Sequence, residues 1–68
     1  MKKYGVIIEY DGYCGTIVSV EGIHYLALKK DFLYENINKG DLVKFSSENI
    51  SNITETKDRA RFIKKIEV

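Results

Sequence analysis

Hydrophobic and polar residues alternate along the first part of the chain, and this period of two is typical of β-strands whose two faces differ. Residues 3–10 alternate in this way, and the Asp11-Gly12 pair after them is typical of a tight hairpin turn. Residues 13–20 are rich in β-branched side chains, and residues 23–28 continue beyond a second turn at Glu21-Gly22. Three antiparallel strands joined by tight turns are therefore predicted.

The period of two is lost over residues 29–38, which predict a short helical turn or an irregular crossover. A turn cluster at 38–41 precedes a fourth strand that begins at 42–45, and a fifth strand is predicted over about 58–68. The polar segment 46–56 between these two strands is expected to be mobile.

The last strand alternates apolar and basic residues, so Ala60 and Phe62 are expected on the face opposite Arg59 and Arg61. The pattern of the first strand leaves open whether Val6 and Ile8, or Ile7, point inward.

Five short strands in one small chain indicate an all-β domain spanning residues 1–68. A chain of this length lacks the material for two stacked sheets, whereas a closed barrel has no exposed edge strands. We therefore expect a small five-stranded OB-fold-like barrel, with an SH3-like barrel as the alternative. Gly5 and Gly15 lie inside predicted strands, where they indicate a bend or bulge that closes the barrel.

Composition narrows the functional classes. The 68 residues are 44% hydrophobic, which is enough for a core, and the formal charge of +1 is not strongly basic. One cysteine and one histidine provide neither a disulfide nor a metal cluster, so we expect no enzyme, no metal and no cofactor. No apolar run approaches the roughly 18 residues of a membrane span, and no signal peptide is recognised, so a cytoplasmic protein is expected.

Several segments resemble a known family in order and spacing. They are Gly5–Tyr10, Gly12-Tyr13-Cys14-Gly15-Thr16-Ile17, His24–Phe32, Lys39-Gly40-Asp41-Leu42-Val43-Lys44-Phe45 and Arg59–Ile63. Together they resemble a cold-shock domain, the small five-stranded OB-fold module that binds single-stranded nucleic acid. The resemblance implies binding of single-stranded RNA or DNA with little sequence preference.

Aromatic and basic residues supply the candidates for that binding. Aromatic rings can stack on bases, and basic side chains can contact phosphates. The last strand is the basic element of the chain. The candidate nucleic-acid-binding residues are Tyr10, Tyr13, Tyr25, Lys29, Lys30, Arg59, Arg61 and Lys64.

A second hypothesis follows from the departures from the family pattern. Cys14, Thr16, Leu26 and Leu28 stand where the resemblance places ligand-contacting positions, most of them rings. Together with Ile8, these residues would form an aliphatic sheet face suited to a protein partner or to self-association, with nucleic-acid binding lost.

Overall fold

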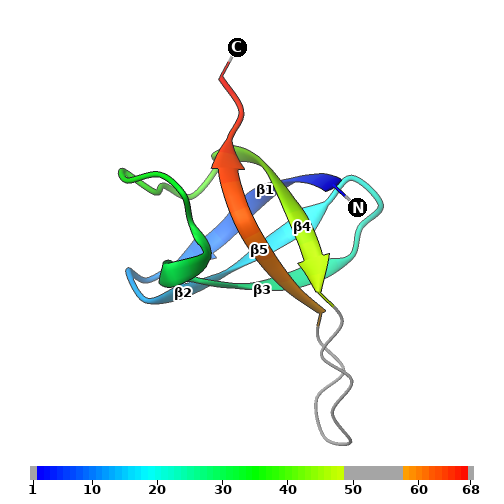
Figure 1. The fold of residues 1–68 in the computed structure, drawn as a ribbon, viewed down its shortest axis with the longest axis horizontal. Helices are drawn as coiled ribbons and strands as arrows, with labels where there is room; N and C mark the ends of the chain where they lie inside the picture. The colour runs from blue at the N-terminus through cyan, green and yellow to red at the C-terminus, as the bar shows by residue number, and fades with distance from the viewer. Residues whose placement is uncertain (1, 49–57, 68) are drawn as a thin grey trace, which may run out of the picture.

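Five β-strands close into a barrel in the computed structural model, which describes residues 2–48 and 58–67. The elements are β1 (Lys2–Tyr10), β2 (Cys14–Ser19), β3 (His24–Leu28), the 3-10 helix η1 (Lys29–Asp31), β4 (Leu42–Glu48) and β5 (Asp58–Lys65). The strand order around the barrel is β1-β2-β3-β5-β4, and β4 pairs with β1 (Figure 1). The predicted small all-β barrel is confirmed, and it is consistent with an OB-fold or an SH3-like barrel.

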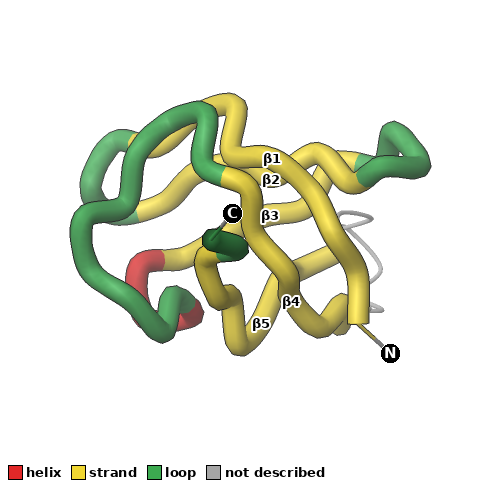
Figure 2. The backbone as a smooth tube through the Cα atoms, turned by 90° about the horizontal axis from the view of Figure 1, so that it is seen from above, coloured by secondary structure: helices red, strands yellow, loops and turns green. Residues whose placement is uncertain are grey.

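Neighbouring strands are antiparallel at every seam except one. β3 and β5 run parallel and pair over only three positions, from Tyr25↔Asp58 to Ala27↔Ala60. The crossover that precedes β4 contains η1 and adds an isolated bridge between Phe32 and Ile63. Figure 2 shows η1 and this connection gathered at one end of the ring of strands.

The observed boundaries refine the predicted ones. Residues 46–48 of the segment expected to be mobile belong to β4, and the remainder of that segment lies outside the described residues. β5 ends at Lys65, before the predicted end. Within the described ranges, no helix is long and apolar enough to cross a membrane.

The barrel interior is filled by side chains from all five strands and the crossover. In β1 the inward residue is Ile7, whereas Ile8 is exposed, which settles the choice that the pattern left open. A β-bulge between Ile7 and Glu9 then shifts the register, so that Glu9 lies opposite Thr16. The buried apolar core comprises Ile7, Ile17, Tyr25, Ala27, Phe32, Val43, Phe45, Ala60 and Ile63.

A second register shift, in β5, makes the expectation for Phe62 wrong. Lys44 pairs with Lys64 and Ser46 with Arg61, so the β5 side of the ladder contains an extra residue. Ile63 therefore occupies the core position, and Phe62 points outward with 60% of its surface exposed.

Candidate functional site

The tip of the β1–β2 hairpin presents Tyr13 on an ordered turn. Asp11 Oδ1 accepts hydrogen bonds from the backbone N–H groups of Tyr13 and Cys14, both at 2.9 Å. These two N–H groups, that of Cys14 first, lower the pKa of the Asp11 carboxyl, as expected for a carboxylate that closes a turn. The Tyr13 side chain is 78% exposed, so the turn holds an aromatic residue out in solvent.

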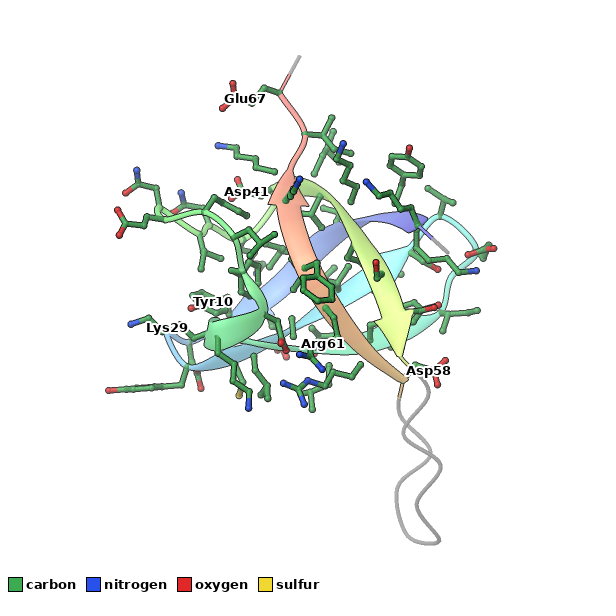
Figure 3. All side chains as sticks on the ribbon, in the orientation of Figure 1. Tyr10, Lys29, Asp41, Asp58, Arg61 and Glu67 are labelled. Atoms are coloured by element: carbon green, nitrogen blue, oxygen red, sulfur yellow. The ribbon has the colours of Figure 1, made fainter. Side chains whose placement is uncertain are left out.

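Basic residues of η1 lie beside this tip. The Lys29 backbone N–H donates to the Tyr13 carbonyl at 2.9 Å, and this bond ties the start of η1 to the hairpin. Lys29 and Lys30 are both exposed, and Lys29 lines the same hollow as Tyr10. Figure 3 shows Tyr10 and Lys29 close together at this end of the barrel. We refer to Tyr10, Tyr13, Lys29 and Lys30 as the hairpin-tip cluster.

Tyr10 contributes only part of its ring to this cluster. The ring packs edge-on against Phe32 at a centroid distance of 5.3 Å, and Phe32 packs in the same way against Tyr34 at 5.8 Å. The Tyr34 hydroxyl donates to Asp41 Oδ2 at 3.0 Å, and burial followed by this bond raises the pKa of the Tyr34 hydroxyl. These contacts hold Tyr10 as the floor of the hollow.

The structure does not support the prediction that Tyr25 contacts a ligand. Tyr25 is only 2% exposed and packs edge-on against Phe45 in the core at a centroid distance of 4.9 Å. The cause is the alternation of the strand. Leu26 faces outward, so the ring of its neighbour must face inward.

The arginines of β5 already bind a carboxylate of this chain. Asp31, at the end of η1, is buried, and Arg59 contacts both of its oxygens, with Nε at 2.9 Å from Oδ2 and Nη2 at 3.1 Å from Oδ1. Arg61 Nε lies 2.9 Å from Asp31 Oδ1. Much of the positive charge predicted to meet phosphates therefore neutralises Asp31. Lys64 is exposed but belongs to the outer face of β4 and β5, apart from the hairpin tip.

The aliphatic residues of the second hypothesis do come together. Cys14 pairs with Leu28 and Thr16 with Leu26, so all four side chains lie on the outer face of β2 and β3, and all four are half-buried. Glu9, rather than Ile8, lies opposite Thr16. Ile8 sits at the bulge and is 37% exposed. We refer to Cys14, Thr16, Leu26 and Leu28 as the aliphatic face.

The part of the chain that the structure describes contains no candidate metal-binding site. No group of three or more His, Cys, Asp or Glu residues there could hold a metal ion, and Cys14 is a free thiol. Neither a protein-family model nor a curated protein sequence matches this chain. Its function is therefore inferred from its own residues.

Two features of the structure were not predicted from the sequence. Asp31 lies 28 positions from Arg59, and no local pattern indicates that the two meet. A regular alternation would place Phe62 on the inner face, and the register shift in β5 turns it outward. A pair of adjacent residues that both suit the core, Phe62 and Ile63, was the available signal for such a bulge.

Proposed function

We propose that the protein binds single-stranded RNA or DNA at the hairpin-tip cluster, in line with the resemblance to cold-shock domains. The observation that carries the proposal is the exposure of Tyr13 on a turn already closed by Asp11. Because Asp11 already orders the backbone that carries this ring, less conformational entropy is lost when a base stacks on it. Lys29, which lines the hollow with Tyr10, and the exposed Lys30 next to it would contact the phosphates of the same strand.

The geometry favours weak binding with little sequence preference. Within the described residues, Tyr13 is the one prominent ring at the tip, because Tyr10 is packed against Phe32 and Tyr25 is in the core. One stacked base contributes about 1–3 kcal/mol, so a strand held by one ring and two lysines should be released readily as salt rises. We place this activity in the cytoplasm, where the free Cys14 thiol stays reduced.

Replacing the exposed ring tests this proposal directly. Tyr13→Ala should weaken binding of a mixed-sequence single-stranded oligonucleotide about fivefold or more at low salt, because the stacking contribution is lost. Fluorescence anisotropy measures the affinity. Val20→Ala is the matched control, because it removes another highly exposed apolar side chain at the far end of β2. Equal affinities for all three proteins would refute stacking on Tyr13.

The aliphatic face supports a second candidate function, protein–protein interaction. Two cross-strand pairs, Cys14–Leu28 and Thr16–Leu26, form a mostly apolar, half-buried surface beside the Glu9 carboxylate, which repels phosphate. The partner in the simplest case is a second copy of the chain.

A charge introduced at the centre of this face distinguishes the second candidate. Leu26→Asp should abolish concentration-dependent self-association, because it places a charge inside an apolar contact, and the neighbouring Arg59 across the ladder is already bound to Asp31. Sedimentation across a range of protein concentrations reports the effect, and Val20→Asp is the control for added negative charge. If the wild-type protein stays monomeric at all concentrations, or if Leu26→Asp associates as well as wild type, this face is not a self-association interface.

A further inference from the structure

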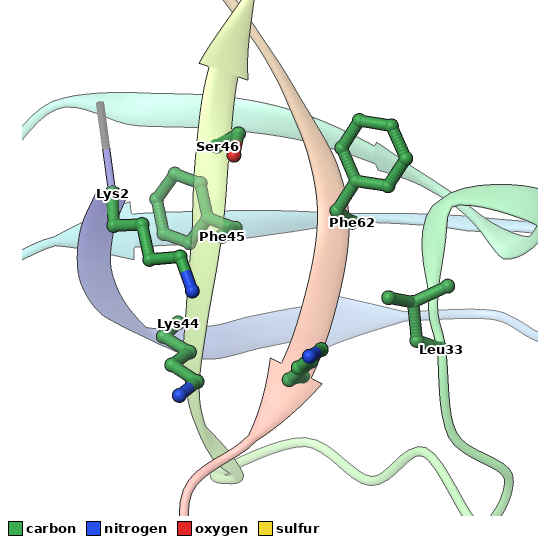
Figure 4. Close-up of a pocket in the computed structure, with 7 residues that line it drawn as sticks. Lys2, Leu33, Lys44, Phe45, Ser46 and Phe62 are labelled. Carbon is green, nitrogen blue, oxygen red and sulfur yellow. The ribbon is translucent and has the colours of Figure 1, made fainter.

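A second aromatic and basic surface lies on the outer face of β4 and β5, and it shares no residue with the hairpin-tip cluster. A hollow of about 260 Å³ there is bordered by Lys2, Leu33, Lys44, Phe62 and Lys64, with the buried Phe45 as its floor. We refer to the five bordering residues as the β4–β5 surface. Figure 4 shows Phe62 and Leu33 on one side of this hollow, and Lys2 and Lys44 on the other.

Phe62 is held outward at a conformational cost. Its φ is +54°, in the left-handed region that a bulky side chain rarely adopts, yet the ring is 60% exposed rather than buried in the core. Two neighbours fix its position. The Arg61 guanidinium lies 5.6 Å from the ring centroid, and the Leu33 N–H donates to the Ile63 carbonyl at 2.8 Å, which brings Leu33 alongside. The fold therefore keeps a largely exposed ring on a strained backbone.

The lysines of this surface carry a second local cost. Lys44 of β4 and Lys64 of β5 are directly opposite each other in the antiparallel ladder. On the other side of β4, Lys2 of β1 pairs with Ser46. Like charges at directly opposite positions destabilise a sheet. Within residues 2–48 and 58–67, no ion pair joins any of these three lysines to a carboxylate, and no acidic residue borders the hollow. An anion placed here would relieve the repulsion.

From these observations we propose that the β4–β5 surface is a binding site for a phosphate-bearing aromatic base, with the base on Phe62 and the phosphate among Lys2, Lys44 and Lys64. A flat ring and a cluster of lysines with no ion-pair partner among the described residues together match a base joined to a phosphate, and neither feature alone does so. Inorganic polyphosphate would contact the lysines but not the Phe62 ring. The bases of a double-stranded helix are stacked inside the duplex and could not stack on this ring. This ligand chemistry occurs both in a free nucleotide and in a single strand, so the test separates these two sources.

Phe62→Asn is the variant that isolates the ring. Asparagine tolerates positive φ better than phenylalanine, so this change should leave thermal stability unchanged or raised while it removes the stacking surface. Amide-resolved NMR titrations of the full chain would use four probes: adenosine monophosphate, a short mixed-sequence single-stranded oligonucleotide, the corresponding duplex and inorganic polyphosphate. Lys44→Gln tests the phosphate contact, and Lys3→Gln is its control, because Lys3 instead contacts Glu21 at 3.4 Å.

The expected result is a set of shifts at the amides of the β4–β5 surface with the single strand, weakened about tenfold in Phe62→Asn. Lys44→Gln should lower the salt dependence of log affinity by about 0.7, and Lys3→Gln should not. The same shifts with the monophosphate would assign the site to free nucleotides, and shifts with the strand alone would assign it to nucleic acid. Shifts equal in size with polyphosphate, affinity unchanged in Phe62→Asn, or no shifts at these amides would overturn the proposal.

The titration also separates this site from the hairpin-tip cluster. Shifts confined to residues 10–16 and 28–30 would support the proposed function and overturn the β4–β5 site. Shifts confined to the β4–β5 surface would support this site and overturn binding at the hairpin tip. An absence of shifts at both places would overturn both.

Discussion

Asp31→Asn should lower the free energy of unfolding by about 3 kcal/mol. This is a large part of the total stability of a domain of this size. The Asp31 side chain is 3% exposed and receives Arg59 on both oxygens and Arg61 on one. Removing the carboxylate leaves two guanidinium groups that lose their shared buried anion. The resulting cost exceeds the net benefit of the ion pairs themselves, because both guanidinium groups stay partly desolvated without that buried carboxylate.

The position of Asp31 in the barrel explains why the effect should be global. β3 and β5 pair over only three positions, so their parallel seam is the shortest contact in the ring of strands. Asp31 lies at the end of η1, which follows β3 directly, and it binds Arg59 within that seam and Arg61 just beyond its last pair. The ion pairs therefore extend the closure of the barrel where the backbone ladder ends.

Urea denaturation followed by circular dichroism measures this prediction. Glu35→Gln makes the same chemical change at an exposed position of the same crossover and should have little effect. The loss in Asp31→Asn should persist in high salt, because buried ion pairs are screened far less than surface ones. A loss below about 1 kcal/mol, or one that disappears as salt is added, would show that the cluster acts only as a surface contact.

In β2 and β3, alternation alone predicts correctly which face of the strand each side chain occupies. Within β2 and β3 alternate side chains face the core, and Cys14, Thr16, Leu26 and Leu28 share the outer face, so a period of two placed them correctly. The same rule would have placed Tyr25 in the core, one position from Leu26. Its candidacy for ligand contact came from residue type, and residue type does not determine which face a side chain occupies.

The bulges mark where alternation fails. The extra residue at Ile8 turns Glu9 toward the outer face, and the extra residue in β5 does the same for Phe62. A bulge depends on how two strands fit together, and its position is not encoded in the period of either strand. The cluster of Asp31 and the two arginines likewise depends on how strands fit together, because it forms only when β3 and β5 pair. The elements could therefore be predicted from the sequence, whereas the outward ring and the neutralised arginines could not.

Gly15→Ala should also strongly destabilise the fold, by about 3 kcal/mol, because it forces a Cβ into the backbone of β1. An ideal Cβ at Gly15 would overlap the Glu9 carbonyl oxygen and lie 3.0 Å from the Tyr10 Cα. Both obstacles are main-chain atoms, so no side-chain rotation can relieve the overlap. The crowding occurs next to the bulge in β1, where the strand bends over β2 to close the barrel.

Gly22→Ala is the matched control, because the two changes add the same methyl group in different surroundings. Gly22 has a φ of +86°, and among the described residues no heavy atom other than those of Gly22 and its two chain neighbours lies within 4 Å of an added Cβ, so this substitution meets strain without overlap. It should cost about 1–2 kcal/mol, less than Gly15→Ala. Thermal and urea unfolding of both variants compares the costs, and a Gly15→Ala protein as stable as Gly22→Ala would contradict the close approach of β1.

The position of Tyr10 provides a second, local readout of the same substitution. Tyr10 pairs with Gly15 across the β1–β2 ladder, and its ring rests on Phe32 at 5.3 Å. If β1 must move to accommodate the methyl group, the ring contact should loosen, and the Tyr10 and Phe32 ring protons should shift in the NMR spectrum. Since Tyr10 is also the floor of the hairpin-tip cluster, the variant should lose oligonucleotide affinity in the fraction that remains folded. Gly22→Ala, at the turn between β2 and β3, should keep both the ring shifts and the affinity of the wild-type protein.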